Sequence, residues 1–414
     1  MRPVEVARKA KEASKALAHF PTDRKNGVLQ SLARLLEENK PFLFEENLKD
    51  LTQAREEGMA ESLVERLRLD EKVLKEMILA LHDVMELPDP VGDMGKLWRR
   101  PNGLLVGRMR IPIGVICIIY ESRPNVTVDA FSLCLKSGNA VILKGGREAY
   151  YSNKALFSMI AQALEENQVT PHAASLVETS EREYLYDLLK LADEIDLVIP
   201  RGGEALIRSV AEHSRVPVLK HYKGVCAIYV DEHADLEMAQ SVCLNAKVQK
   251  PATCNAVETL LVHEGISREL LPSLMPLFSR NGVTVKGCKR VREMFPEAQE
   301  ALERDWYEEY LDLTIAVRIV NDMDEAIAHI GRYGSEHTDA IITSDYANAW
   351  RFLREVDSSL VLVNASTRLN DGYQLGLGTE MGISTTKLHA FGPMGLEELT
   401  VRKFIAFGDG QVRV

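Results

Sequence analysis

The feature that most constrains the fold is a regular alternation of short apolar runs with longer amphipathic runs between residues 115 and 364. Such runs indicate buried strands that helices connect into parallel sheets. The pattern divides into two cycles near residue 226, and one helix is expected between the second and third strands of the second cycle. The expected strands span residues 115–120, 140–144, 175–179 and 195–200 in the first cycle, and 226–230, 257–263, 312–320, 339–344 and 359–364 in the second.

Further segments flank these two cycles. Residues 1–86 have leucines at helical spacing, and a stretch rich in proline and glycine, 87–103, then interrupts the regular pattern. Residues 104–114 alternate in part and predict a β-hairpin arm, and residues 402–414 predict one more strand. The sequence therefore predicts an α/β fold with two doubly wound, Rossmann-like domains and a small β arm.

Composition and charge argue against several classes of function. The 414 residues are 46% hydrophobic and 27% charged, as in ordinary soluble proteins, and the net charge of −11 disfavours binding to nucleic acid or to an anionic membrane. The longest apolar run, 111–120, is too short to span a bilayer, and the N-terminal segment lacks the apolar core of a signal peptide. The six cysteines form no CxxC pair and no zinc spacing, so we expect a cytoplasmic protein with reduced thiols and no metal site.

Two predicted strand-to-helix turns share a cation followed by two glycines, in AVILKGGREAY and DLVIPRGGEALI. Paired glycines let backbone N–H groups approach an anion, and the dipole of the following helix adds to the attraction. Two such turns in successive units favour a dinucleotide site, although each could be only a tight turn, and the GxGxxG fingerprint is absent. The candidate cofactor residues are Lys144, Gly145, Gly146, Arg201, Gly202 and Gly203.

Cys254 is the candidate nucleophile. It follows an amphipathic run, 236–248, in the polar sequence PATCN, whereas most of the other cysteines lie within apolar runs. Two nearby cations, Lys247 and Lys250, would lower the pKa of a thiol and favour the reactive thiolate. The alternative is a small apolar side chain without a chemical role, which is the commoner situation for a cysteine.

Asn125 is a candidate donor near such a nucleophile. It follows a predicted strand in the turn ESRPNV, where Pro124 restricts the backbone. Its side-chain amide could donate a hydrogen bond into a cleft, or the side chain could cap the helix that begins there. The two roles are compatible.

Taken together, these stretches resemble the γ-glutamyl phosphate reductases, or glutamate-5-semialdehyde dehydrogenases, a family of the aldehyde dehydrogenase superfamily. The resemblance runs from about residue 100 to the C-terminus, and the helical N-terminal segment fits it. It implies an aldehyde dehydrogenase-like fold, with an NADP-binding domain (1–96 and 112–228), a catalytic domain (229–397) and an oligomerisation arm (97–111 and 398–414). The stretches that carry it are RPNGLLVGRMRIPIGVICIIYESRPNVTVDAFSLCLKSGNAVILKGGREA, DLVIPRGG, VQKPATCNAVETLLVH, VNASTRLNDGYQLGLGTEMGIST and HAFGPMGLEELTVRKF.

The resemblance implies the NADPH-dependent reduction of L-glutamyl 5-phosphate to L-glutamate 5-semialdehyde with release of phosphate, the second step of proline biosynthesis. Cys254 would form a thioester, and Asn125 and the backbone N–H of Cys254 would stabilise the oxyanion. No water attacks, and the segment around Lys220 and His221 accordingly lacks the glutamate that serves as base in hydrolytic relatives. A homo-oligomer, either dimer or tetramer, and a possible partnership with glutamate 5-kinase are further implications.

The resemblance also assigns binding residues. Lys144 would reach the cofactor ribose, and Glu309 the nicotinamide ribose, with Glu308 as a rival. Arg147, three residues after the strand lysine, would bind the 2′-phosphate of NADPH, with the neighbouring carboxylate of Glu148 as its rival for that position. The substrate anchors that it implies, each of which could instead make a purely structural contact, are Arg123, Ser366, Arg368 and His389.

Two rival interpretations stay open. One is a hydrolytic NAD-dependent aldehyde dehydrogenase, which the missing carboxylate near Lys220 disfavours. The other is a catalytically silent binding protein with the same fold, which the presence of Cys254, Asn125 and both glycine turns disfavours.

Overall fold

The computed structural model describes residues 1–179 and 181–413, and the chain divides into two compact units. The first unit comprises Met1–Lys220, Gly376–Gly382 and Met394–Val414, and the second comprises His221–Leu375 and Ile383–Pro393. Each unit contains its own parallel sheet, so the predicted α/β fold with two such sheets is confirmed. Within the described ranges, no helix is both long enough and apolar enough to cross a bilayer.

The main sheet of the first unit contains β3 (Val115–Tyr120), β4 (Ala140–Gly145), β5 (Ala174–Leu176) and β6 (Leu197–Arg201). Its strand order is β5-β4-β3-β6, and all neighbours are parallel. Every residue of the central strand β3 is buried, as its continuous apolar sequence predicts for a strand covered on both faces. The carboxyl ends of β4 and β6 therefore bring the two Gly-Gly turns to the same edge of the sheet.

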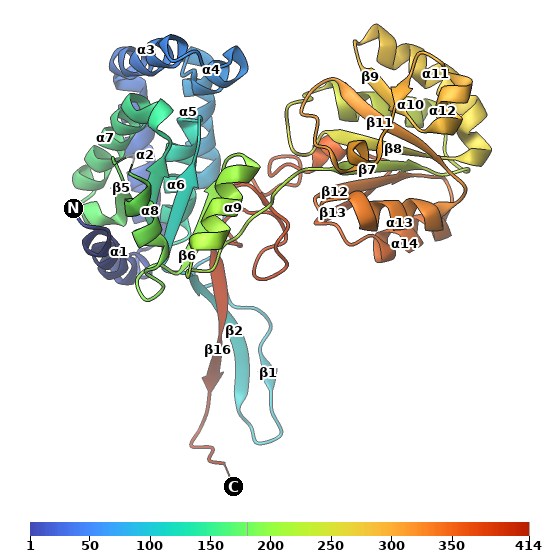
Figure 1. The fold of residues 1–414 in the computed structure, drawn as a ribbon. Coiled ribbons are helices and arrows are strands. Elements are labelled where there is room, and N and C mark those ends of the chain that lie inside the picture. Colours follow the sequence, from blue (N-terminus) through green and yellow to red (C-terminus); the bar gives the residue numbers. More distant parts are fainter. Residues whose placement is uncertain (180, 414) are drawn as a thin grey trace. The chain divides into compact units, whose positions relative to one another are not determined.

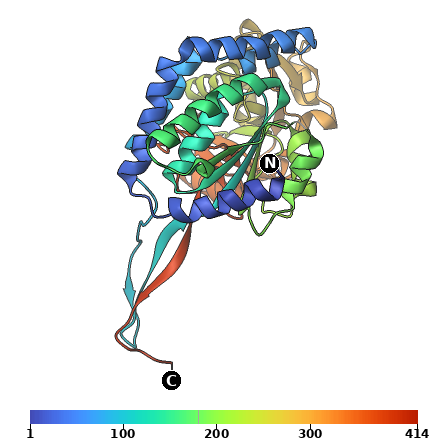
Figure 2. The same cartoon turned by 90° about the vertical axis from the view of Figure 1, so that its left-hand side faces the viewer.

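Helices cover both faces of this sheet (Figures 1 and 2). The elements α6 and α7 pack on one face, beneath an outer layer of α2, α3 and α5, whereas α1, α8 and α9 lie on the other. The predicted helical character of residues 1–86 is confirmed. The helices are α1 (Pro3–Leu17), α2 (Thr22–Glu38), α3 (Lys40–Glu56), α4 (Glu61–Leu67), α5 (Glu71–Glu86), α6 (Asn125–Lys136), α7 (Tyr150–Glu166), α8 (Arg182–Leu189) and α9 (Glu204–His213).

A second, antiparallel sheet of the first unit consists of β1 (Trp98–Arg99), β2 (Leu105–Pro112) and β16 (Thr400–Phe407). The strands β2 and β16 pair along their whole length, from Leu105 opposite Phe407 to Pro112 opposite Thr400. Figure 1 shows this pair extending away from the four-stranded sheet of the same unit. The β arm is confirmed as a structural element, and its role in oligomerisation remains a prediction.

The second unit has a seven-stranded parallel sheet with the order β10-β9-β11-β8-β7-β12-β13 and a small antiparallel pair, β14-β15. Its strands are β7 (Cys226–Val230), β8 (Val257–His263), β9 (Thr284–Gly287), β10 (Gln299–Glu300), β11 (Thr314–Val320), β12 (Thr338–Ile342), β13 (Leu360–Val363), β14 (Ile383–Ser384) and β15 (Gly392–Pro393). Its helices are α10 (Leu236–Val248), α11 (Glu264–Arg280), α12 (Lys289–Met294), α13 (Met323–Tyr333) and α14 (Tyr346–Glu355).

The prediction of a single helix between β8 and β11 is wrong. That segment contains α11, β9, α12 and β10 and ends in a 3₁₀ turn, Glu303–Tyr307. The strand β9 has only four residues and follows Gly282, whose φ of +73° turns the chain at the end of α11. A strand of this length gives too few alternations to be separated from its helical neighbours by periodicity.

Candidate active site

Cys254 lies in a turn between the end of α10 and the start of β8. The side chain is partly exposed, which it shares with Cys288, whereas the other four cysteines are buried. The hydroxyl of Thr253 donates to the carbonyl of Lys250 at 2.8 Å, and the N–H of Ala256 donates to the carbonyl of Thr253 at 3.0 Å. The predicted location of Cys254, in a polar loop just after a helix, is confirmed.

The backbone of Cys254 rests on the chain that leads into β7. A methyl group added to Gly224 would come within 2.0 Å of the Cys254 carbonyl oxygen, so only glycine permits this approach. The thiol of Cys226 donates to the same carbonyl at 3.1 Å. The N–H of Gly224 donates to the Glu309 carboxylate at 2.9 Å, whereas Glu308 is exposed. Glu309, rather than Glu308, is therefore the carboxylate bound to the segment around Gly224 that contacts the backbone of Cys254.

A buried ion pair closes the base of this turn. The ammonium of Lys247, in the last turn of α10, lies 2.6 Å from the carboxylate of Glu258 in β8, and both side chains are fully buried. Burial raises the pKa of Glu258 to about 8, and the nearby ammonium opposes this rise. Lys247 was expected to act as a cation near the thiol, but its charge is bound to Glu258. Of the two lysines considered, only Lys250 is exposed.

The segment after β13 carries three of the predicted substrate anchors. The guanidinium of Arg368 donates from Nε to the side chain of Gln249 at 2.9 Å and from Nη1 to that of Asn255. Burial lowers the pKa of Arg368, and attraction to Asp371 and to Cys254 opposes the change. The hydroxyl of Ser366 accepts from the N–H of Arg368 at 3.4 Å and so caps a 3₁₀ turn. His389 is exposed.

Asn125 is the first residue of α6, and the residue before it, Pro124, is the N-cap. Asn125 therefore does not occupy the N-cap position, and the capping interpretation is wrong. Instead, its amide N–H donates to the carboxylate of Asp129 at 2.9 Å, one helical turn later. Burial raises the pKa of Asp129 to about 6. Arg123, another predicted anchor, is exposed in the turn just before Asn125.

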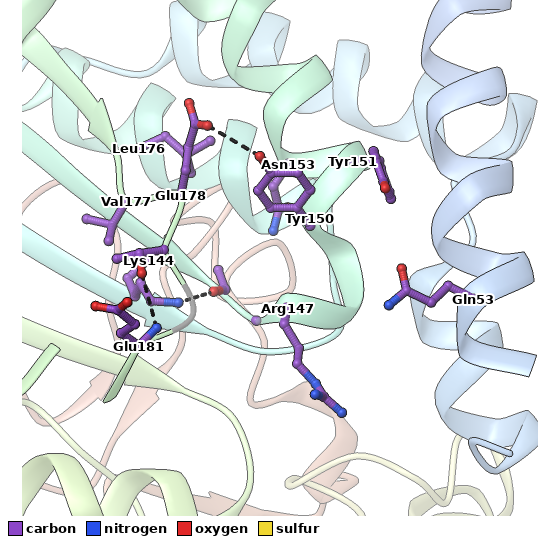
Figure 3. A pocket seen from close by; sticks show the side chains of 13 residues that line it. Gln53, Lys144, Arg147, Tyr150, Tyr151, Asn153, Leu176, Val177, Glu178 and Glu181 are labelled. Carbon is purple, nitrogen blue, oxygen red and sulfur yellow. Dashed lines mark hydrogen bonds between the residues drawn. The ribbon is translucent and has the colours of Figure 1, made fainter. Parts of the chain in front are cut away.

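A cavity of about 520 Å³ opens beside the first Gly-Gly turn in the first unit (Figure 3). A side chain on Gly145 would lie 2.2 Å from the Asn153 amide, and one on Gly146 would lie 2.1 Å from the Glu148 carboxylate, so neither position has room for a side chain unless its neighbour moves. Glu148 accepts from the N–H of Ser122 at 2.7 Å. The cavity lining includes Lys144 and Arg147 but not Glu148, so the rival carboxylate is bound elsewhere.

The remaining lining residues were not predicted from the sequence. Gln53 projects from α3 toward the cavity, far earlier in the chain than the glycine turn, and no local pattern marks it (Figure 3). The residues that follow β5 could have been found, because ligands of parallel sheets bind at the carboxyl ends of strands. The unpredicted residues are Gln53, Tyr150, Tyr151, Asn153, Leu176, Val177, Glu178, Thr179 and Glu181.

The second Gly-Gly turn has a different environment. The N–H of Gly203 donates to the carboxylate of Glu121 at 2.9 Å, and a side chain on Gly202 would lie 2.2 Å from the same carboxylate. The guanidinium of Arg201 packs under Gly382, where an added methyl group would lie 2.5 Å from it. The cavity is thus lined by the first Gly-Gly turn. At the second Gly-Gly turn, the carboxylate of Glu121 already occupies the place where the backbone N–H groups could bind an anion.

Comparisons with known proteins agree on one family. Residues 4–284 match the model of the aldehyde dehydrogenase family. The γ-glutamyl phosphate reductase of Thermodesulfovibrio yellowstonii is 54% identical over 98% of this chain and 97% of its own length, and that of Geobacter metallireducens is 52% identical over 99% and 98%. The crystal structure of γ-glutamyl phosphate reductase from Thermotoga maritima superposes with a TM-score of 0.97 at 46% identity, covering 100% of both chains. An acetylating aldehyde dehydrogenase from Geobacillus thermoglucosidasius, at 16% identity over 100% of this chain and 97% of that one, has a TM-score of 0.70 and shares the fold.

Proposed function

The chain belongs to the aldehyde dehydrogenase family, and from this premise we propose that it reduces L-glutamyl 5-phosphate to L-glutamate 5-semialdehyde with release of phosphate. The observation that carries the proposal is an identity of 52–54% with curated γ-glutamyl phosphate reductases over almost the whole chain. In that role the enzyme would catalyse the second step of proline biosynthesis. Its substrate would be supplied by an acyl-phosphate-forming kinase.

The proposed chemistry begins with the thiolate of Cys254. It attacks the acyl carbon, a C–S bond forms, and the carbonyl oxygen becomes an oxyanion that needs two donors. The amide of Asn125 and the backbone N–H of Cys254 are the proposed donors. The C–O bond to the phosphate then breaks, the electron pair leaves with the phosphate, and a thioester remains on Cys254. Because no water molecule attacks in these steps, the reaction needs no general base to activate water.

Membership of the family implies a nicotinamide cofactor. The cavity beside the first Gly-Gly turn fits a nucleotide, because Lys144 and Arg147 supply positive charge and the two glycines leave the backbone accessible. When bound, the cofactor supplies hydride. We propose NADPH rather than NADH, with Arg147 as the residue that binds the 2′-phosphate. Glu309, through its position beneath Cys254, is the proposed partner of the nicotinamide ribose.

Replacement of the nucleophile tests this proposal. Cys254→Ser should abolish nearly all NADPH-dependent reduction while leaving cofactor binding intact, because a hydroxyl is far less ionised than a thiol. Cys288→Ser, at the other partly exposed cysteine, is the matched control and should retain activity. Turnover above about a tenth of the wild-type rate in Cys254→Ser would contradict the assignment.

Product analysis separates the rival activities. In the oxidative direction, the proposed enzyme should consume the semialdehyde only when inorganic phosphate is present. A hydrolytic aldehyde dehydrogenase would instead form glutamate without phosphate. A catalytically silent protein would do neither, and its Cys254 would react no faster with alkylating agents than a thiol without activating neighbours.

A further inference from the structure

Arg368 is a partly buried cation that is held by neutral groups. Its two hydrogen-bond partners, Gln249 and Asn255, are both amides. In the described part of the chain, the ion pairs do not include Arg368. Buried charges are normally paired, because taking an unpaired charge out of water is costly. An arginine in this situation is therefore suited to receive an anion from outside the protein.

The two amides fix the direction of the guanidinium. Asn255 is itself buried, and its own amide N–H donates to the carbonyl of Asn370 at 2.9 Å. Gln249 lies at the C-cap of α10. Together they use two of the five N–H groups of a guanidinium, which leaves three for a ligand. Both holders are uncharged, and Asp371, which attracts the guanidinium, forms no ion pair with it among the described residues, so positive charge of Arg368 stays available to that ligand.

The arginine also lies close to the thiol. Asn255 directly follows Cys254 in the chain, and a thiolate at Cys254 would attract the guanidinium of Arg368. In an acyl phosphate, the phosphoryl oxygen is bonded to the carbon that the thiolate attacks, so the phosphoryl group must lie beside Cys254. The α-carboxylate lies at the opposite end of the glutamyl chain.

We propose that Arg368 binds the phosphoryl group of the substrate and the phosphate that leaves, and that Asn255 and Gln249 are positioning residues for it. This inference rests on the proposed function. As the C–O bond breaks, the electron pair moves onto the phosphate oxygen, and a guanidinium can stabilise the growing charge with two parallel hydrogen bonds. Arg368 would thus contact the leaving group, and the carboxylate would be bound elsewhere.

The first experiment measures charge at the thiol and needs no substrate. Alkylation of Cys254 by iodoacetate, an anion, and by iodoacetamide, its neutral analogue, is followed by mass spectrometry of the peptide that contains Cys254. Arg368→Gln should lower the ratio of the two rates at least fivefold. Inorganic phosphate should slow alkylation in the wild type but not in the variant. An unchanged ratio without protection by phosphate would overturn the anion site.

The second experiment identifies the group that is bound. In the oxidative direction, with semialdehyde, NADP and inorganic phosphate, Arg368→Gln should raise the KM for phosphate at least tenfold and change the KM for semialdehyde less than twofold. A rise confined to the semialdehyde would assign Arg368 to the carboxylate and overturn the proposal. If the wild type is inactive in this assay, the proposed function fails, and the alkylation experiment alone decides whether Arg368 is an anion site.

A variant of a positioning residue tests the proposal independently, in case Arg368→Gln does not fold. Gln249 is exposed, so Gln249→Glu should fold normally and place a carboxylate against Arg368. The expected result is a three- to tenfold increase in the KM for phosphate, with little change in the KM for semialdehyde. Gln299→Glu, the same change at an exposed position of β10, is the matched control and should leave both constants unchanged. Equal effects of the two variants would contradict the positioning role.

Discussion

At the scale of single residues, the best-defined catalytic candidate after Cys254 is Asn125, because its side-chain amide has a fixed partner. One amide N–H donates to Asp129 at 2.9 Å, so the second N–H has a fixed direction. A donor of this kind stabilises an oxyanion only if it is oriented before the reaction begins. We therefore assign Asp129 a positioning role.

Asn125→Ala should lower kcat about 10²-fold with little change in KM, which is the usual contribution of one oxyanion donor. Asp129→Asn should lower kcat about tenfold, or ~1.4 kcal/mol, because an amide orients Asn125 less firmly than a carboxylate does. The double variant should be no slower than Asn125→Ala, since Asp129 acts only through Asn125. Fully additive losses in kcat would contradict the positioning role, and thermal unfolding of each variant controls for misfolding.

Arg147 is the residue on which the choice between NADPH and NADH is expected to depend. It lines the cavity beside Gly146, and its guanidinium lies 3.3 Å from the carboxylate of Glu57 in an exposed pair. Such a pair contributes little stability, so the arginine can exchange Glu57 for a phosphate. Arg147→Glu should shift the ratio of kcat/KM values at least tenfold toward NADH, equivalent to about 1.5–3 kcal/mol for a charge-assisted contact.

The control for Arg147→Glu is Lys190→Glu, the same reversal of charge at an exposed pair with Asp187 in the same unit. It should leave the cofactor ratio unchanged. A second variant, Glu57→Gln, removes the competing carboxylate and should strengthen NADPH binding slightly. If Arg147→Glu leaves the ratio at its wild-type value, the 2′-phosphate is bound by another residue.

At the scale of the elements, the strands that the sequence predicts best are the buried ones. The runs VICIIY, CAIYV and VETLLVH coincide with β3, β7 and β8, because a strand covered on both faces is predominantly apolar, and β8 keeps enough apolar residues around Glu258 to show this pattern. The strands β9 and β10 were missed because each has four residues or fewer and no strong apolar pattern. Periodicity therefore identifies strands in proportion to their burial and length.

The site was predictable where a local pattern carries the chemistry, as in the loop of Cys254 and the first Gly-Gly turn. It was not predictable where side chains from distant segments decide the outcome. Glu121 fills the second Gly-Gly turn, and Gln53 reaches the cavity from α3. Neither contact leaves a trace in the spacing of nearby residues, since both depend on how separate elements pack.

The ion pair between α10 and β8 is a further example, and its contribution to stability can be tested. Lys247→Met removes the ammonium that lowers the pKa of Glu258, so that pKa should rise further above about 8. At neutral pH the variant should lose about 1–3 kcal/mol of unfolding free energy, because a buried polar group loses its partner. Lys250→Met, the same change at an exposed neighbour, should cost far less.

The pH dependence of Lys247→Met follows from the direction of this shift. Above pH 8 the folded variant keeps a proton on Glu258 that the unfolded chain has released. The free energy of unfolding of the variant should then fall with rising pH by up to ~1.4 kcal/mol per pH unit. The wild-type protein should not show this decrease once its Glu258 is ionised in the folded state. Denaturant unfolding at about pH 7.5 and 9.5 measures the difference. Parallel changes in the two proteins would show that Lys247 does not control the ionisation of Glu258.

At the scale of the whole molecule, the β arm is the feature that points to association between chains, because it ends in an open strand edge. The strand β16 is the outer strand of its sheet, so one row of backbone groups has no partner strand within that sheet. Phe404 and Phe407 on this strand are 63% and 56% exposed. Open strand edges that carry exposed apolar side chains promote association. The two side chains are three residues apart and so point to opposite faces of the strand. We expect a second copy of the chain to pair with the open edge and to cover both.

The double variant Phe404→Glu/Phe407→Glu should convert a dimer or tetramer into monomers, as measured by sedimentation equilibrium. A fully buried phenylalanine contributes about 1.5–3 kcal/mol to the free energy of association. In a two-fold symmetric interface each substitution occurs twice, so the dissociation constant should rise more than about a thousandfold. Phe42→Glu, at another exposed phenylalanine of the first unit, is the matched control and should leave the assembly intact. Deletion of Leu104 to Arg110 removes most of β2, the partner of β16, and should also give monomers. A wild-type protein that sediments as a monomer, or a double variant that keeps its full assembly, would show that the arm has another role.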